Sequence, residues 1–196
     1  MRDIYIVEKI LDLYKRCHIH SFPVDCTDIL KQLNCRVYSY SYLKEHHPAL
    51  YSYCSRYSDD GLKYKDVVIY NDNHAKSRIR FTLAHEIGHI ILGHTALSPH
   101  CEQQANAFAA NLLAPLPLIY YYHCQSASDI SQKFGLSAPA ADIAWSDYLK
   151  WKHSSHFDAD IQLIYYIKDY DNYINNNKPD KKNHVKLILD SDTNIW

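Results

Sequence analysis

The sequence lacks both an excess of one charge and a long apolar run. Its 21 Lys and Arg residues nearly balance its 22 Asp and Glu residues, so no overall field favours nucleic acid or an anionic membrane. The longest apolar stretch, residues 112–122, is interrupted by Pro115 and Pro117 and is too short to span a bilayer. The N-terminus shows no basic segment followed by an apolar signal core. These absences predict a cytoplasmic protein without a membrane partner.

The cysteines lack any Cys-x-x-Cys pair. The six are scattered along the chain, as Cys17, Cys26, Cys35, Cys54, Cys101 and Cys124. This distribution favours buried, reduced thiols over disulfides or a second metal site. With 196 residues and 47% hydrophobic side chains, the chain is long enough to form a core without such crosslinks.

The most informative motif that is present is His-Glu-x-x-His, formed by His85, Glu86 and His89 within a segment that is predicted to be helical. With about 3.6 residues per turn, positions four apart lie on one helix face. Two imidazoles so placed can hold one zinc ion, and the glutamate between them can act on a water molecule. Two unrelated histidines on a helix would give the same pattern, so a second element is needed.

Glu102 supplies that second element. A catalytic zinc ion usually has three protein ligands and one open position. The positions at which metzincins carry a glycine and a third histidine hold Leu92 and Thr95 here, and His94 is one residue out of register. The alternative ligand is a carboxylate from the following helix, residues 101–113. A surface acid near a helix start would also explain Glu102, but the histidine pair favours the ligand.

The segment that carries Glu102 has two further useful features. Asn106 follows one turn later and could accept a hydrogen bond from the free ring N–H of a ligating histidine, which fixes the ring orientation. The alanines at positions 105, 107, 109 and 110 would allow this helix to pack closely against the first one.

Residues 80–94 and 102–115 together resemble the ImmA/IrrE family of metallo-endopeptidases in the order and spacing of both blocks. The resemblance implies a zincin-like α+β fold, in which His85, His89 and Glu102 bind zinc and Glu86 is catalytic. It also implies a protein substrate, because the described members cleave helix-turn-helix repressors of bacteria and mobile elements. The rival hypothesis is a non-catalytic, zinc-containing anti-repressor, or a regulator that binds DNA or a partner.

Before the motif, periodicity predicts two helices and a small sheet. Helical spacing covers residues 4–17, and a shorter helix begins at Asp25 or Thr27 as the cap. Alternating patterns predict strands at 36–42, 50–57 and 66–70, joined in an antiparallel sheet. The metal-binding helix should cover residues 75 or 77 to 92. One strand should border the cleft, since proteases commonly add an extended peptide to an exposed sheet edge.

The division that we expect is a metallopeptidase core at 1–125, a helix-turn-helix-like segment at 126–152 and a C-terminal extension at 153–196. In the second segment, acidic residues precede the first basic residue of the second helix, Lys150. A DNA reader needs basic or amide groups there, so direct nucleic-acid binding is not expected. The extension should hold strands at 161–167 and 184–190 joined by a mobile loop.

When water attacks a peptide carbonyl, the carbonyl oxygen becomes an oxyanion, and one further hydrogen-bond donor to it is expected in such a site. His123 and Tyr120 are the favoured candidates, because they follow the Glu102 helix in a segment with two prolines that could fold back over the metal. The other candidates are Tyr121, Tyr122, His94 and His100. Arg78 and Arg80 lie near the start of the motif helix, where cations are mildly unfavourable. They could bind substrate, pair with acids or be exposed to solvent.

Overall fold

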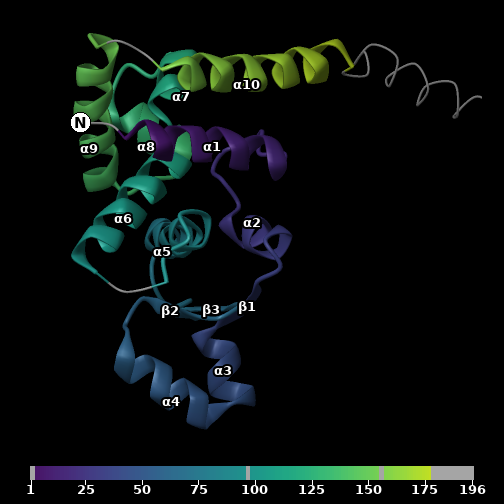
Figure 1. Ribbon diagram of the computed structural model, residues 1–196, viewed down its shortest axis with the longest axis vertical. Coiled ribbons are helices and arrows are strands. Elements are labelled where there is room, and N and C mark those ends of the chain that lie inside the picture. The colour runs from purple at the N-terminus through teal and green to yellow at the C-terminus, as the bar shows by residue number, and fades with distance from the viewer. Residues whose placement is uncertain (1–2, 96–97, 155–156, 178–196) are drawn as a thin grey trace, which may run out of the picture.

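A computed structural model of the chain describes residues 3–95, 98–154 and 157–177. These residues form ten helices and one three-stranded sheet (Figure 1). The first half contains α1 (Ile4–Arg16), α2 (Cys26–Gln32), β1 (Arg36–Ser39), α3 (Tyr40–His46), α4 (Pro48–Tyr57), β2 (Gly61–Tyr64) and β3 (Val67–Tyr70). The second half contains α5 (Lys76–Ile91), α6 (Pro99–Leu113), α7 (Leu116–Tyr121), α8 (Ala127–Phe134), α9 (Ala138–Lys152) and α10 (Asp158–Asn176).

The predicted α+β class is confirmed, but the sheet is mixed rather than antiparallel. Its strand order is β1–β3–β2, with β3 parallel to β1 and antiparallel to β2. A parallel pair needs a long crossover between its strands, and here α3, α4 and β2 provide it. Figure 1 shows the sheet between α5 on one side and the α3–α4 pair on the other.

Several predicted elements of the first half are confirmed. The structure contains helices α1, α2 and α5 and strand β3 close to their expected limits. Asp25 caps α2, since its carboxylate accepts hydrogen bonds from the backbone N–H groups of Thr27 and Asp28. The strand expected over residues 36–42 ends at Ser39, because the Ser39 hydroxyl accepts from the backbone N–H of Tyr42 and starts α3.

The strand predicted over residues 50–57 is wrong, because this segment is helix α4. Pro48 stands in its first turn, where a missing N–H costs nothing. Cys54 is buried on the inner face, whereas Tyr53 and Tyr57 are exposed, which is helical rather than alternating burial. The strand that pairs antiparallel with β3 is instead β2, which begins at Gly61.

The strand predicted over residues 161–167 is also wrong, because α10 covers it and continues through the first part of the expected loop. Leu163 and Ile167 are buried and lie four residues apart, so helical spacing describes them better than alternation. The Tyr166 hydroxyl donates to the backbone oxygen of Tyr14 in α1. The strand predicted at 184–190 lies outside the described residues.

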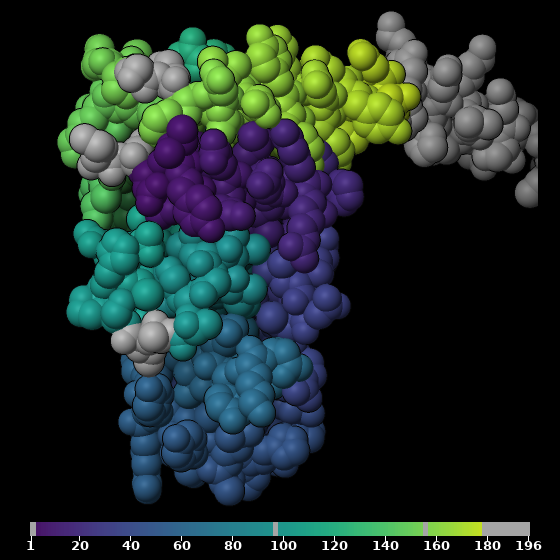
Figure 2. Space-filling view, in the orientation of Figure 1, coloured from purple at the N-terminus to yellow at the C-terminus, as the bar shows by residue number. Residues whose placement is uncertain are grey.

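The main hydrophobic core lies between α1, α5, α6 and the later helices. Tyr14, Phe108 and Phe134 are among its largest fully buried side chains. A smaller cluster on the other face of the sheet contains Tyr40, Leu43, Cys54 and Ile69. In the space-filling view, the blue α3–β3 segment forms one end of the molecule, with teal α5 and α6 between it and α10 (Figure 2). Among the described helices, none is long and apolar enough to cross a membrane.

Candidate metal centre

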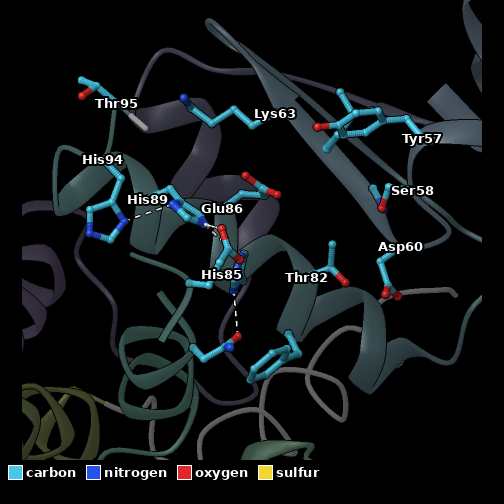
Figure 3. A pocket seen from close by; sticks show the side chains of 15 residues that line it. Tyr57, Ser58, Asp60, Lys63, Thr82, His85, Glu86, His89, His94 and Thr95 are labelled. Carbon is cyan, nitrogen blue, oxygen red and sulfur yellow. Dashed lines mark hydrogen bonds and ion pairs between the residues drawn. The ribbon is translucent and has the colours of Figure 1, made fainter. Parts of the chain in front are cut away.

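Three side chains from two helices converge on one point; Figure 3 labels the two histidines among them. His85 and His89 lie one turn apart on α5, and their Nε2 atoms are 3.0 Å from each other. Glu102, in the first turn of α6, places Oε2 3.3 Å from His85 Nε2 and Oε1 3.4 Å from His89 Nε2. One donor atom from each residue lies within 4.8 Å of the other two. The structure thus brings together the three residues that the sequence predicted as ligands.

Close packing of α5 against α6 makes this convergence possible. Gly88 lies between the motif's buried residues Ile87 and His89. A Cβ atom there would lie 3.2 Å from backbone atoms of Ala105 and from the Cβ of Phe108, closer than ordinary carbon contacts of about 3.5–4.0 Å. The glycine and the small Ala105 therefore let the helix backbones approach, which brings Glu102 to the histidine pair.

Hydrogen bonds from outside the cluster orient both rings. His85 Nδ1 lies 2.9 Å from the amide oxygen of Asn106, the contact that the sequence suggested. His89 Nδ1 lies 3.0 Å from His94 Nδ1, and His94 Nε2 lies 3.2 Å from the amide oxygen of Gln104. An amide oxygen accepts only, so His85 carries its proton on Nδ1 and His94 carries its proton on Nε2. His89 then donates to His94, and the Nε2 atoms of His85 and His89 both present lone pairs.

Glu86 lies beside these donors on α5 and lines the same pocket. Burial raises the pKa of its carboxyl group above the ordinary value, against the opposing charges of His85 and Lys63. Burial also lowers the pKa of His89, which favours the neutral imidazole that a metal requires. The cluster therefore combines imidazole nitrogen donors with a carboxyl group whose pKa is raised.

The cluster lies in a pocket of about 640 Å³. One wall is formed by Gly61, Leu62 and Lys63 of β2. The remaining lining residues outside the cluster come from the end of α4 and the loop that follows it, from α5, from the segment after α5 and from α6: Tyr57, Ser58, Asp60, Phe81, Thr82, His94, Thr95 and Asn106. A sheet edge thus borders the cleft, but its strand, β2, is none of the three strands that the sequence predicted.

Most of the expected oxyanion donors lie elsewhere. His100, Tyr120, Tyr121, Tyr122 and His123 do not line the pocket. The segment that we expected to fold back over the metal is helix α7 with its C-terminal turn. There the Tyr120 ring lies 6.2 Å from that of Trp151, and the Tyr121 hydroxyl donates to Asp171. His94 does line the pocket, but its two ring nitrogens already face His89 Nδ1 and the amide oxygen of Gln104.

Sequence reasoning missed Lys63, Gln104 and Tyr57. Lys63 lies in β2 and Tyr57 at the end of α4. The alternating sequence pattern predicted neither element, so it did not indicate that these two residues line the pocket. Gln104 follows Glu102 by two residues and acts through His94, so only the tertiary contact identifies it.

The two arginines at the start of α5 have structural partners. Arg78 pairs with Asp60, with Nε 2.5 Å from Oδ1, and also reaches Asp59. This pair joins α5 to the loop before β2, and Arg78 is the main reason that the pKa of Asp60 is lowered. Arg80 donates to the backbone oxygen of Gly135, in the turn between α8 and α9. Of the roles considered for Arg78, pairing with acids describes it best.

A helical scaffold with a small sheet and a His-His-Glu cluster in an open pocket defines a candidate metal-dependent hydrolase. The family model described as IrrE N-terminal-like domain, Peptidase M78, matches residues 39–146, more than half of the chain. The chain belongs to this family, and the match includes all three donors and Glu86. Membership indicates a metallopeptidase that acts on protein. A search of curated proteins found no match.

Proposed function

We propose that the chain is a zinc-dependent endopeptidase with a zincin-like arrangement of its site. The observation that carries the proposal is the convergence of His85, His89 and Glu102 beside the half-buried Glu86. A purely structural metal site would not need a base next to its ligands. Peptidase family membership adds independent support.

The residues present fit a zinc ion. Two imidazole nitrogens and one carboxylate oxygen are a known ligand set of catalytic zinc, with the fourth position open to solvent or substrate. The Nδ1 atoms of His85 and His89 face Asn106 and His94, which leaves their Nε2 atoms directed at the cluster, and the family implies a metal. When bound, zinc supplies Lewis acidity, which makes water more acidic and polarises a peptide carbonyl.

Glu86 is the proposed general base and acid. Its carboxylate accepts a proton as water attacks the carbonyl carbon of the substrate, and it returns that proton to the amine as the C–N bond breaks. Its burial supports this role, since a raised pKa makes the carboxylate a better proton acceptor. His94 and Gln104 hold His89, and Asn106 holds His85, so that the donor geometry is set before substrate binds.

Strand β2 is the proposed support for an extended substrate. Its only sheet neighbour in the described structure is β3, and its residues line the pocket. The backbone N–H and C=O groups of an edge strand can pair with a peptide, which would position the scissile carbonyl by main-chain hydrogen bonds. This placement supports cleavage within a chain rather than at a terminus.

The proposed substrate is a regulatory protein of the cytoplasm, namely a helix-turn-helix repressor of a phage, a mobile element or a stress response. Its support is the resemblance of the two motif blocks to the ImmA/IrrE family. A flexible or locally unfolded segment of such a repressor could enter the β2 edge as a strand.

The test incubates the chain with purified helix-turn-helix repressors, beginning with any that is encoded beside it. Wild-type protein with zinc should convert the repressor to two fragments on electrophoresis, and a chelator should prevent this. Glu86→Gln should bind zinc at the wild-type ratio without cleaving, whereas the matched change Glu45→Gln on the exposed face of α3 should leave cleavage intact. Cleavage by Glu86→Gln at the normal rate would contradict the mechanism. Release of the repressor from DNA by Glu86→Gln would favour an anti-repressor that acts by binding alone.

A further inference from the structure

Lys63 occupies a distinctive position on the cleft wall. In the sheet register, Leu62 lies opposite Ile69 and Lys63 lies opposite Val68. Ile69 and Leu62 pack into the smaller cluster with α3 and α4, whereas Val68 is fully buried in the main core on the α5 side. Successive side chains of a strand point to opposite faces. Lys63 therefore projects toward α5, at the open edge of the same layer that contains Val68.

The Lys63 ammonium group makes no hydrogen bond or ion pair among the described residues, and its charge acts on Glu86, whose carboxyl pKa it lowers against the effect of burial. Two other acidic groups near the cleft have close partners. Asp60 is held by Arg78, and Glu102 faces both histidines. Figure 3 shows Lys63 extended along the pocket, with its nitrogen on the side where His94 and Thr95 lie. A half-buried cation on a cleft wall is suited to an anionic group of an incoming ligand.

We propose that Lys63 makes this site selective for peptides with an acidic side chain close to the cleaved bond. This inference rests on the proposed peptidase function. An extended peptide on the β2 edge would turn alternate side chains toward the α5 face, where Lys63 projects. With about 3.3 Å per residue, the lysine side chain reaches substrate positions within about two residues of the bond near Glu86. A glutamate or aspartate there pairs with the ammonium group, and a glutamine does not.

The experiment uses the zinc-loaded full chain and a mixture of defined peptides, with cleavage sites mapped by mass spectrometry. The wild type should enrich Asp or Glu at one position within about two residues of the cut, with roughly tenfold faster cleavage of Glu than Gln versions of one peptide. Lys63→Met should abolish this preference, Lys63→Arg should retain it, and Lys63→Glu should shift it toward Lys and Arg. Lys65→Glu is the matched control, since the exposed Lys65 lies against the Tyr64 ring and does not line the pocket.

Each other outcome overturns the inference in a distinguishable way. Wild-type cleavage without acidic enrichment, or an acidic preference kept by Lys63→Glu, shows that Lys63 does not read the substrate. If Lys63→Met slows all peptides equally with the preference unchanged, Lys63 acts on the reaction itself, through Glu86 or the oxyanion, instead of selecting side chains. If Lys63→Met keeps the preference and the protein self-associates, the lysine protects the sheet edge. If the wild type cleaves no peptide, the proposed function itself fails and the inference falls with it.

Discussion

Gly88→Val tests whether close helix packing creates the metal centre. The added Cβ would lie 3.2 Å from Ala105 backbone atoms and from Phe108 Cβ, and normal contact requires about 3.5–4.0 Å. The backbones of α5 and α6 must therefore separate by about 0.3–0.8 Å. Overpacking a core by such groups costs about 1–3 kcal/mol. Valine adds two methyl groups beyond that Cβ and regains only a few tenths of a kcal/mol in helix propensity. We therefore expect the free energy of unfolding to fall by about 3 kcal/mol.

The same displacement should weaken metal binding. Ligand distances in metal sites hold to about 0.2 Å, so moving Glu102 away from His85 and His89 by more than this should lower zinc affinity at least about tenfold. For a chain of this length, about 3 kcal/mol corresponds to a melting temperature roughly 6–12 °C lower. Thermal unfolding of the metal-free protein and zinc titration against a competing chelator measure the two effects.

Ala110→Val provides the matched control, because it places the same side chain at an exposed position of α6. It should cost only about 0.6 kcal/mol of helix propensity and leave zinc affinity unchanged. If Gly88→Val melts like Ala110→Val and binds zinc like the wild type, the helices are not held at the distance that we describe. The argument that close packing brings Glu102 to the histidines would then be refuted.

Three further predictions follow from individual contacts. Glu102→Ala removes one of three donors and should reduce bound zinc to near none, whereas an unchanged metal ratio would make Glu102 an ordinary surface acid. Gln104→Ala frees His94 from its amide partner and should lower zinc affinity about 10–100-fold without changing the unfolding of the metal-free protein. Arg78 holds the pKa of Asp60 in the folded protein below its usual value. The Asp60 carboxylate therefore stabilises the fold at pH values above the pKa of an unfolded aspartate, about 3.9. This stabilisation is lost as the pH falls through the lower pKa of the folded state. Because the pair is partly exposed, Asp60→Asn should lower the free energy of unfolding by at most about 1 kcal/mol at pH near 7. Urea unfolding should show that this difference from wild type vanishes in acid. A difference in unfolding free energy that is independent of pH would contradict the prediction.

Local patterns predicted the parts of the site that local geometry controls. The spacing of His85 and His89 places both rings on one face of any helix, and the structure brings their Nε2 atoms together. The cap of α2 could also be limited to Asp25 or Thr27, because capping involves neighbours in the chain, and the structure selects Asp25. Glu102 and Asn106 could be named from residue type and helical spacing, but their distances to the histidines depend on how α6 packs on α5.

Short segments were predicted less well, because a few apolar residues fit two periods. Residues 50–57 and 161–167 each show an alternating pattern, yet the contacts of Cys54 with the small cluster and of Leu163 and Ile167 with the main core select helices. The prediction of an antiparallel sheet was affected by the same error. Because residues 50–57 form a helix and not a strand, β2 is the strand that lies beside β3.

By itself, the amino-acid order determined the motif, the helix that carries it, and the chemical types of the metal donors, because these depend on neighbours within a few turns. Only the tertiary structure decided which sheet edge borders the cleft, that residues 120–123 lie away from it, and that Lys63 and Gln104 lie close to it. These outcomes depend on contacts between residues far apart in sequence. Such contacts arise when buried faces pack together, and no local pattern records them.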